Sequence, residues 1–161
     1  MLKESLRCRL AGQLDGIEWT IGAGVAERIS RRPEINKWSP HEHLAHLACY
    51  HQRFLDRIRS ILATDRPLFK RYRAEDDPEW PSWQSLSTEE VLTRLHSSRR
   101  ELLDLVSPLG DEQLERVGVH PVFGAVTIPQ WLEFFLVHEA HHLYVVMTLA
   151  WRGPAAGSQS R

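Results

Sequence analysis

The chain has 161 residues, the length of one domain, and can bury a substantial core without disulfides or structural metal. Its 20 lysines and arginines balance 21 aspartates and glutamates, giving a formal net charge of -1 without a basic block, which argues against nucleic-acid binding. The two cysteines, Cys8 and Cys49, lie far apart, and we recognise neither a signal peptide nor a membrane-spanning stretch, so we expect a cytoplasmic protein.

The N-terminal region predicts one amphipathic helix. Its apolar residues recur at a spacing near 3.6, the period of an α-helix. They are Leu6, Leu10, Leu14, Ile17, Ile21 and Val25. We expect this helix to end before Pro33.

Three capping boxes predict the starts of three more helices, because the N-cap side chain and a Glu or Gln three residues later bind free backbone amides. They occupy residues 39–42, 87–90 and 127–130. The helices that follow are expected to run to about Leu62, to the break at Pro108 and Gly110, and to about Trp151. Residues 111–115 predict one short extra turn.

Residues 63–86 carry three prolines and two tryptophans, Trp80 and Trp83, among many charges. This composition predicts a long loop that packs over the helices rather than a regular element. No alternating strand longer than a few residues is evident. We therefore predict an all-α fold, an antiparallel four-helix bundle over residues 1–151, with a disordered tail over residues 152–161.

The most informative motif is HEAHH at residues 138–142, within the fourth predicted helix. Residues at i and i+4 share a helical face, so His138 and His142 can bind one metal ion together. The motif also fits the His-Glu-x-x-His pattern of zincin proteases, which need a further ligand downstream. Residues 143–161 contain no His, Asp, Glu or Cys, so a third ligand must come from an earlier segment.

The second predicted helix supplies four candidates for that ligand: His41, His43, His46 and His51. His46 is preferred because it lies deep in the helix between small alanines, and His43 is its rival. On the fourth helix the pair shares a face with Trp131, Phe135, Val145 and Leu149. This face is expected to point into the bundle.

Residues 38–47, WSPHEHLAHL, closely resemble the W-S-P-x-E-x-L-x-H-L signature of the DinB/YfiT-like superfamily of metal-binding four-helix bundles. Residues 120–142, from HPVFGAVTI through Trp131 to HEAHH, are similar to a second segment of that family in order and spacing. The resemblance covers residues 1–151. It implies one ligand from the second helix and an i, i+4 pair from the fourth, at positions that match His46, His138 and His142.

One position departs from the family pattern. Relatives often have a glutamine three residues after the last histidine, where this chain has Val145. A polar side chain that could line the pocket is therefore missing.

Three neutral imidazoles leave the charge of a divalent ion uncompensated and a coordination position open, as in catalytic metal sites. The first hypothesis is a metal-dependent transferase that uses a low-molecular-weight thiol, or a hydrolase, acting on a small molecule; the family includes both kinds of protein. The second is a non-catalytic, stress-associated bundle that binds a metal or small ligand, and the third is a purely structural histidine cluster. We expect zinc or nickel, with iron or manganese as alternatives, and a homodimer is compatible with the family.

No catalytic residue is assigned from the sequence. Glu139 is expected to point about 100° away from His138, which argues against its acting as a zincin-like base. Other side chains could serve the site or have an ordinary role. The alternative is exposure at a helix edge for His43, Arg53 and Arg99, and packing in the core for Cys49 and Tyr50. Trp80 and Trp83 could cover the pocket or cap the end of the bundle.

Overall fold

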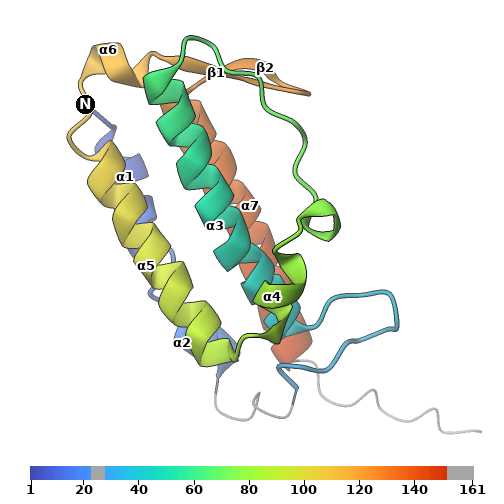
Figure 1. The fold of residues 1–161 in the computed structure, drawn as a ribbon. Helices are drawn as coiled ribbons and strands as arrows, with labels where there is room; N and C mark the ends of the chain where they lie inside the picture. The colour runs from blue at the N-terminus through green and yellow to red at the C-terminus, as the bar shows by residue number, and fades with distance from the viewer. Residues whose placement is uncertain (23–27, 152–161) are drawn as a thin grey trace, which may run out of the picture.

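Three long helices form most of the computed structural model, which describes residues 1–22 and 28–151. They are α3 (Pro40–Ala63), α5 (Thr88–Val106) and α7 (Ile128–Trp151). α3 packs against both α5 and α7, and the three lie side by side (Figure 1). Their bounds agree with the prediction to within a few residues.

The first predicted helix is broken in two. α1 (Glu4–Gly12) and α2 (Ile17–Ile21) are joined by a turn, and together they take the fourth place in the bundle, against α5 and α7. The prediction of one continuous helix was wrong because Gly12 and Gly16 flank the turn, and glycine favours breaks in a helix. The prediction of its buried face is confirmed for four residues: Leu6, Leu10, Leu14 and Ile17 are all buried. Val25 and the predicted tail lie outside the described residues.

α3 and α5 run parallel, whereas α3 and α7 run antiparallel. His41 contacts Thr88 near the start of α3, and Arg59 contacts Glu101 near its end, so both helices proceed in the same direction. Residues 64–87 must therefore return along the length of the bundle (Figure 1). The four-helix bundle is confirmed, but the prediction that neighbouring helices are antiparallel was wrong for α3 and α5, because the returning segment lets both start at the same end.

The returning segment is more regular than predicted. It contains a 3-10 turn, η1 (Ala74–Asp76), and a short helix, α4 (Trp80–Ser85). Trp80 and Trp83 are buried against the bundle, which confirms that the segment packs over it. Burial of the two indoles explains why a proline-rich stretch adopts fixed structure.

The predicted capping boxes are present at α3 and α5. The Ser39 hydroxyl accepts a hydrogen bond from the Glu42 amide at 3.2 Å, and the Ser87 hydroxyl does the same for Glu90. At α7 the Thr127 amide donates to the Gln130 side chain at 2.9 Å. A one-turn helix, α6 (Asp111–Leu114), follows α5 as expected.

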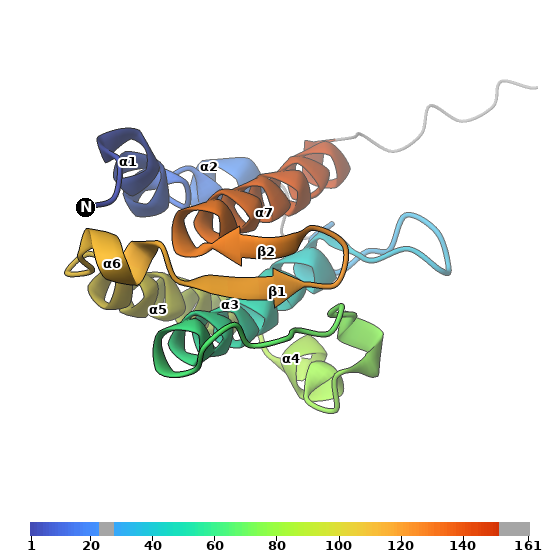
Figure 2. The same cartoon turned by 90° about the horizontal axis from the view of Figure 1, so that it is seen from above.

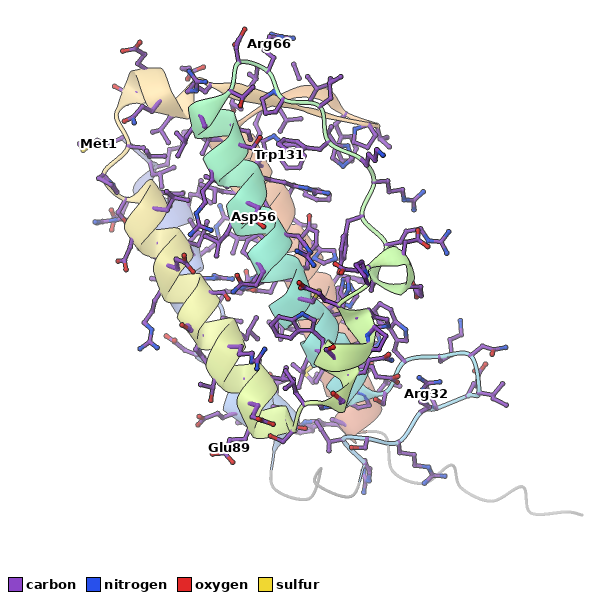
Figure 3. All side chains as sticks on the ribbon, in the orientation of Figure 1. Met1, Arg32, Asp56, Arg66, Glu89 and Trp131 are labelled. Carbon is purple, nitrogen blue, oxygen red and sulfur yellow. The ribbon has the colours of Figure 1, made fainter. Side chains whose placement is uncertain are left out.

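A small antiparallel hairpin of β1 (Val117–His120) and β2 (Gly124–Thr127) lies across one end of the bundle (Figure 2). This hairpin was not predicted from the sequence, and its two strands are only four residues long. Gly118 is required there, because a Cβ atom would lie 2.6 Å from the Phe69 ring. The labelled Trp131 marks the start of α7 beneath this end (Figure 3).

No helix within the described ranges combines the length and hydropathy that a membrane crossing requires.

Candidate metal centre

Three imidazoles from two helices meet at one point inside the bundle. His46 comes from α3, and His138 and His142 come from successive turns of α7. One nitrogen of each ring lies within 4.8 Å of the others, and Nε2 of His46 is 3.2 Å from Nε2 of His138. We call these residues the histidine cluster. They are the three positions that the sequence resemblance indicated.

The other three histidines of α3 have different partners. His43 Nδ1 lies 2.8 Å from Nδ1 of His142, at the edge of the cluster. His41 contacts the Thr88 hydroxyl at 2.9 Å, and His51 contacts the Glu139 carboxylate at 2.6 Å, outside the cluster. The structure thus separates His46 from its rival His43, which contacts a member of the cluster without belonging to it.

The cluster is built from neutral rings. Burial lowers the pKa of His46 to about 3, of His138 to about 4 and of His142 to about 2, and the neighbouring imidazoles act in the same direction. At neutral pH each ring therefore keeps a lone pair on one nitrogen. Neutral imidazole is the form of histidine that binds metal ions.

Aromatic rings enclose the cluster on several sides. The Trp38 ring packs on His46 at a centroid distance of 5.0 Å, and the Tyr50 ring packs on His138 at 4.4 Å. Tyr72, from the returning segment, stacks on His46 at 5.9 Å. Trp38 and Tyr72 were not predicted as site residues. Trp38 carried a signal, since it opens the WSP signature. Tyr72 lies in a stretch without a motif.

Glu139 is turned away from the cluster and is fully buried. Its carboxylate accepts hydrogen bonds from Gln13 at 2.8 Å and from Arg99, and it contacts His51. Burial would raise the pKa of Glu139, but His51 and Arg99 outweigh it and lower the pKa to about 2. Because its carboxylate is held in this buried network, Glu139 does not serve as a zincin-like base. Arg99, which contacts it, lies in the core rather than at a solvated helix edge.

Cys49 and Arg53 also have structural partners. The Cys49 thiol lies 3.2 Å from the Tyr72 hydroxyl, and burial raises the pKa of this thiol to about 11. Arg53 donates to Asp77 at 2.8 Å and to Glu79 at 2.8 Å. Cys49 is therefore a protonated core residue, and Arg53 ties the returning segment to α3.

Comparison with known proteins finds one matching family and relatives of similar sequence. The model of the DinB superfamily matches residues 25–146. YuaE from Bacillus subtilis (strain 168) is 29% identical over 132 residues, which cover 73% of this chain and 80% of YuaE. A protein of Oceanobacillus iheyensis named "Putative metal-dependent hydrolase OB0782" is 25% identical over 128 residues, which cover 78% of this chain and 73% of that protein.

Two solved structures share the fold. YfiT from Bacillus subtilis, described as "a probable metal-dependent hydrolase with an unusual four-helix bundle topology", superposes with a TM-score of 0.72 and 16% identity, over 93% of this chain and 89% of YfiT. TT2238, "a four-helix bundle protein", gives a TM-score of 0.66 and 21% identity, over 90% of this chain and 98% of TT2238. The fold is therefore a four-helix bundle of the YfiT type.

Proposed function

The chain belongs to the DinB superfamily, and from this premise we propose that it is a metal-dependent hydrolase of a small molecule, with His46, His138 and His142 as metal ligands. One observation carries the proposal: three neutral imidazoles converge from α3 and α7 on one point. The names of the Oceanobacillus protein and of YfiT support the reaction class.

The geometry of the histidine cluster fits a divalent ion. Two nitrogens bound to one ion at about 2.0–2.1 Å in tetrahedral geometry lie about 3.3 Å apart. The observed separation of the His46 and His138 Nε2 atoms is 3.2 Å. Within the described part of the chain, Nδ1 of both rings is buried without a hydrogen-bond partner.

A divalent ion held there supplies Lewis acidity and lowers the pKa of water toward about 7. The protein supplies position and a water-poor surrounding. Trp38 and Tyr50 pack on the cluster rings and fix their planes, while Trp80 covers His46 from the returning segment at a centroid distance of 6.3 Å. Exclusion of water by these rings strengthens electrostatic effects at the reacting group.

Metal content and turnover test the proposal together. Protein purified without added metal should hold about one equivalent of metal per chain by elemental analysis, and His46→Ala or His142→Ala should lose it. His141→Ala is the matched control, because His141 is exposed, neighbours His142 and lies outside the cluster. Equal metal content in all four proteins would overturn the ligand assignment.

A panel of ester and amide substrates then tests hydrolysis, with zinc and nickel reconstituted separately. We expect turnover that needs the metal and is lost in His46→Ala. Thiol transfer is the second candidate, since the proposed ion has an open position that could hold a thiolate. A parallel panel of electrophiles with glutathione, bacillithiol or mycothiol separates the two: a rate that requires the thiol assigns a transferase, and no metal-dependent rate in either panel rejects an enzyme.

A further inference from the structure

A pocket of about 430 Å³ lies beside the histidine cluster. This volume falls in the range of small-molecule sites, about 300–1,000 Å³. Its wall combines residues 33–43, which precede α3 and form its first turn, with the last turns of α7; Trp38, His43, Val145 and Leu149 line the space. These two segments are distant in the chain, and the pocket exists only because α3 and α7 pack together.

His43 and Trp38 connect the pocket to the cluster. His43 lines the pocket, and its Nδ1 is 2.8 Å from Nδ1 of His142. Trp38 also lines the pocket, and its ring stacks on His142 at a centroid distance of 6.2 Å and an angle of 26°. His43 and Trp38 therefore lie where the pocket adjoins His142.

The inner wall of the pocket is apolar. Val145 follows His142 by three residues and Leu149 follows Val145 by four, so the α7 face that carries the ligands continues as an aliphatic surface. The Trp38 indole contributes a further apolar surface. The charged residues of the pocket, Glu34, Lys37 and Glu75, are exposed to solvent.

From this arrangement we infer that the pocket binds an aliphatic acyl or alkyl group of the substrate, and that Val145 is a specificity-determining residue. The inference rests on the proposed function and narrows it to small molecules with an apolar tail. The tail is buried against Val145, Leu149 and Trp38, and these apolar surfaces disfavour a charged group because they offer it no partner. Binding energy from such a non-reacting part holds the reacting group at the cluster.

Straight-chain hydroxamates, from acetohydroxamate to octanohydroxamate, test the inference by calorimetry on zinc-loaded and metal-free protein. Affinity should rise about fourfold per buried methylene group. Val145→Gln, which introduces an amide into the aliphatic wall, should weaken octanohydroxamate about tenfold and leave acetohydroxamate unchanged. Leu149→Gln is a second variant with the same expected pattern, in case Val145→Gln does not fold.

Val137→Gln is the matched control, because Val137 lies on the same helix but is 66% exposed. It should bind both hydroxamates like the wild type. Equal affinity for short and long hydroxamates, or equal effects of the Val145 and Val137 variants, would overturn the assignment of the pocket. Affinities that rise with chain length but are equal with and without zinc would support the pocket and count against the metal-dependent function.

Discussion

His43 is the residue whose position says most about the site. For His142 to offer Nε2 to a metal, its Nδ1 must carry the proton, and a hydrogen-bond acceptor for that proton fixes the orientation of the ring. His43 Nδ1 lies 2.8 Å from that atom. Burial lowers the pKa of His43 to about 4, so the ring is neutral and can accept at Nδ1. His43 thus orients His142, one of the proposed ligands, without belonging to the histidine cluster.

His43→Phe should weaken zinc binding by about 10–100-fold, as expected when the hydrogen-bond partner of a ligating histidine is removed. The affinity is measured by competition with a chromophoric chelator, and His43→Gln, which retains an acceptor, should recover part of it. His141→Phe removes an exposed imidazole next to His142 and should leave the affinity unchanged. Equal affinities for His43→Phe and the wild type would refute the positioning role.

At the scale of elements, the buried Glu139 network holds the bundle together. The Glu139 carboxylate on α7 contacts Arg99 on α5, His51 on α3, and Gln13 in the turn after α1. Arg99 also donates to the Leu10 carbonyl of α1 at 2.7 Å. An unpaired buried charge is costly. The network therefore favours the one arrangement in which α1, α3, α5 and α7 are all in place around the Glu139 carboxylate.

Glu139→Gln should lower the free energy of unfolding by about 3–5 kcal/mol, because it leaves the Arg99 charge buried without a counter-charge. Urea unfolding measures the loss. The comparison is Glu133→Gln on the same helix, where the ion pair with Arg9 is half exposed and a loss of at most about 1 kcal/mol is expected. Similar losses in the two variants would show that the network contributes little.

The capping box at the start of α3 should make a pH-dependent contribution to the stability of the fold. Burial would raise the pKa of Glu42, but hydrogen bonds from Arg32 and Ser39 outweigh it and lower the pKa from its ordinary value of about 4.5 to about 2. A depressed pKa means that Glu42 stabilises the fold above about pH 4.5 and loses this contribution as the pH falls toward 2.

Glu42→Gln should therefore lower the melting temperature at pH 7, by an amount equivalent to about 1–2 kcal/mol, and the difference from the wild type should shrink between pH 4.5 and 2. Melting followed by circular dichroism checks this. Glu90→Gln removes the corresponding carboxylate of the exposed α5 capping box and should cost less. A difference that stays constant down to pH 2 would contradict the assignment.

For the whole molecule, the proposed metal joins α3 and α7 through their side chains. A ligand that binds only the folded state stabilises it, by about 2.7 kcal/mol at a free concentration 100 times its Kd. Zinc should therefore raise the melting temperature of metal-free protein by about 5–10 °C, and EDTA should reverse the rise. His142→Ala should show no rise; an equal rise in this variant would place the stabilising metal elsewhere.

Local signals in the sequence determined much of this structure. Capping boxes depend on side chains three residues apart, and Ser39 and Ser87 occupy the predicted N-caps. The i, i+4 spacing likewise placed His138 and His142 on one face before any partner was known. The break between α1 and α2 was missed because the apolar stripe continues across the turn at residues 13–16.

Only the tertiary structure decided which side chains meet. From the residues alone His46 and His43 remained rivals, and the family resemblance favoured His46; the packing of α3 on α7 places His46 in the cluster and His43 beside it. The same packing directs Glu139 to Arg99, and the returning segment brings Tyr72 to His46. Periodicity fixes the face of a helix on which a residue lies, but contacts between helices depend on their direction, crossing and depth, which are set by the whole core.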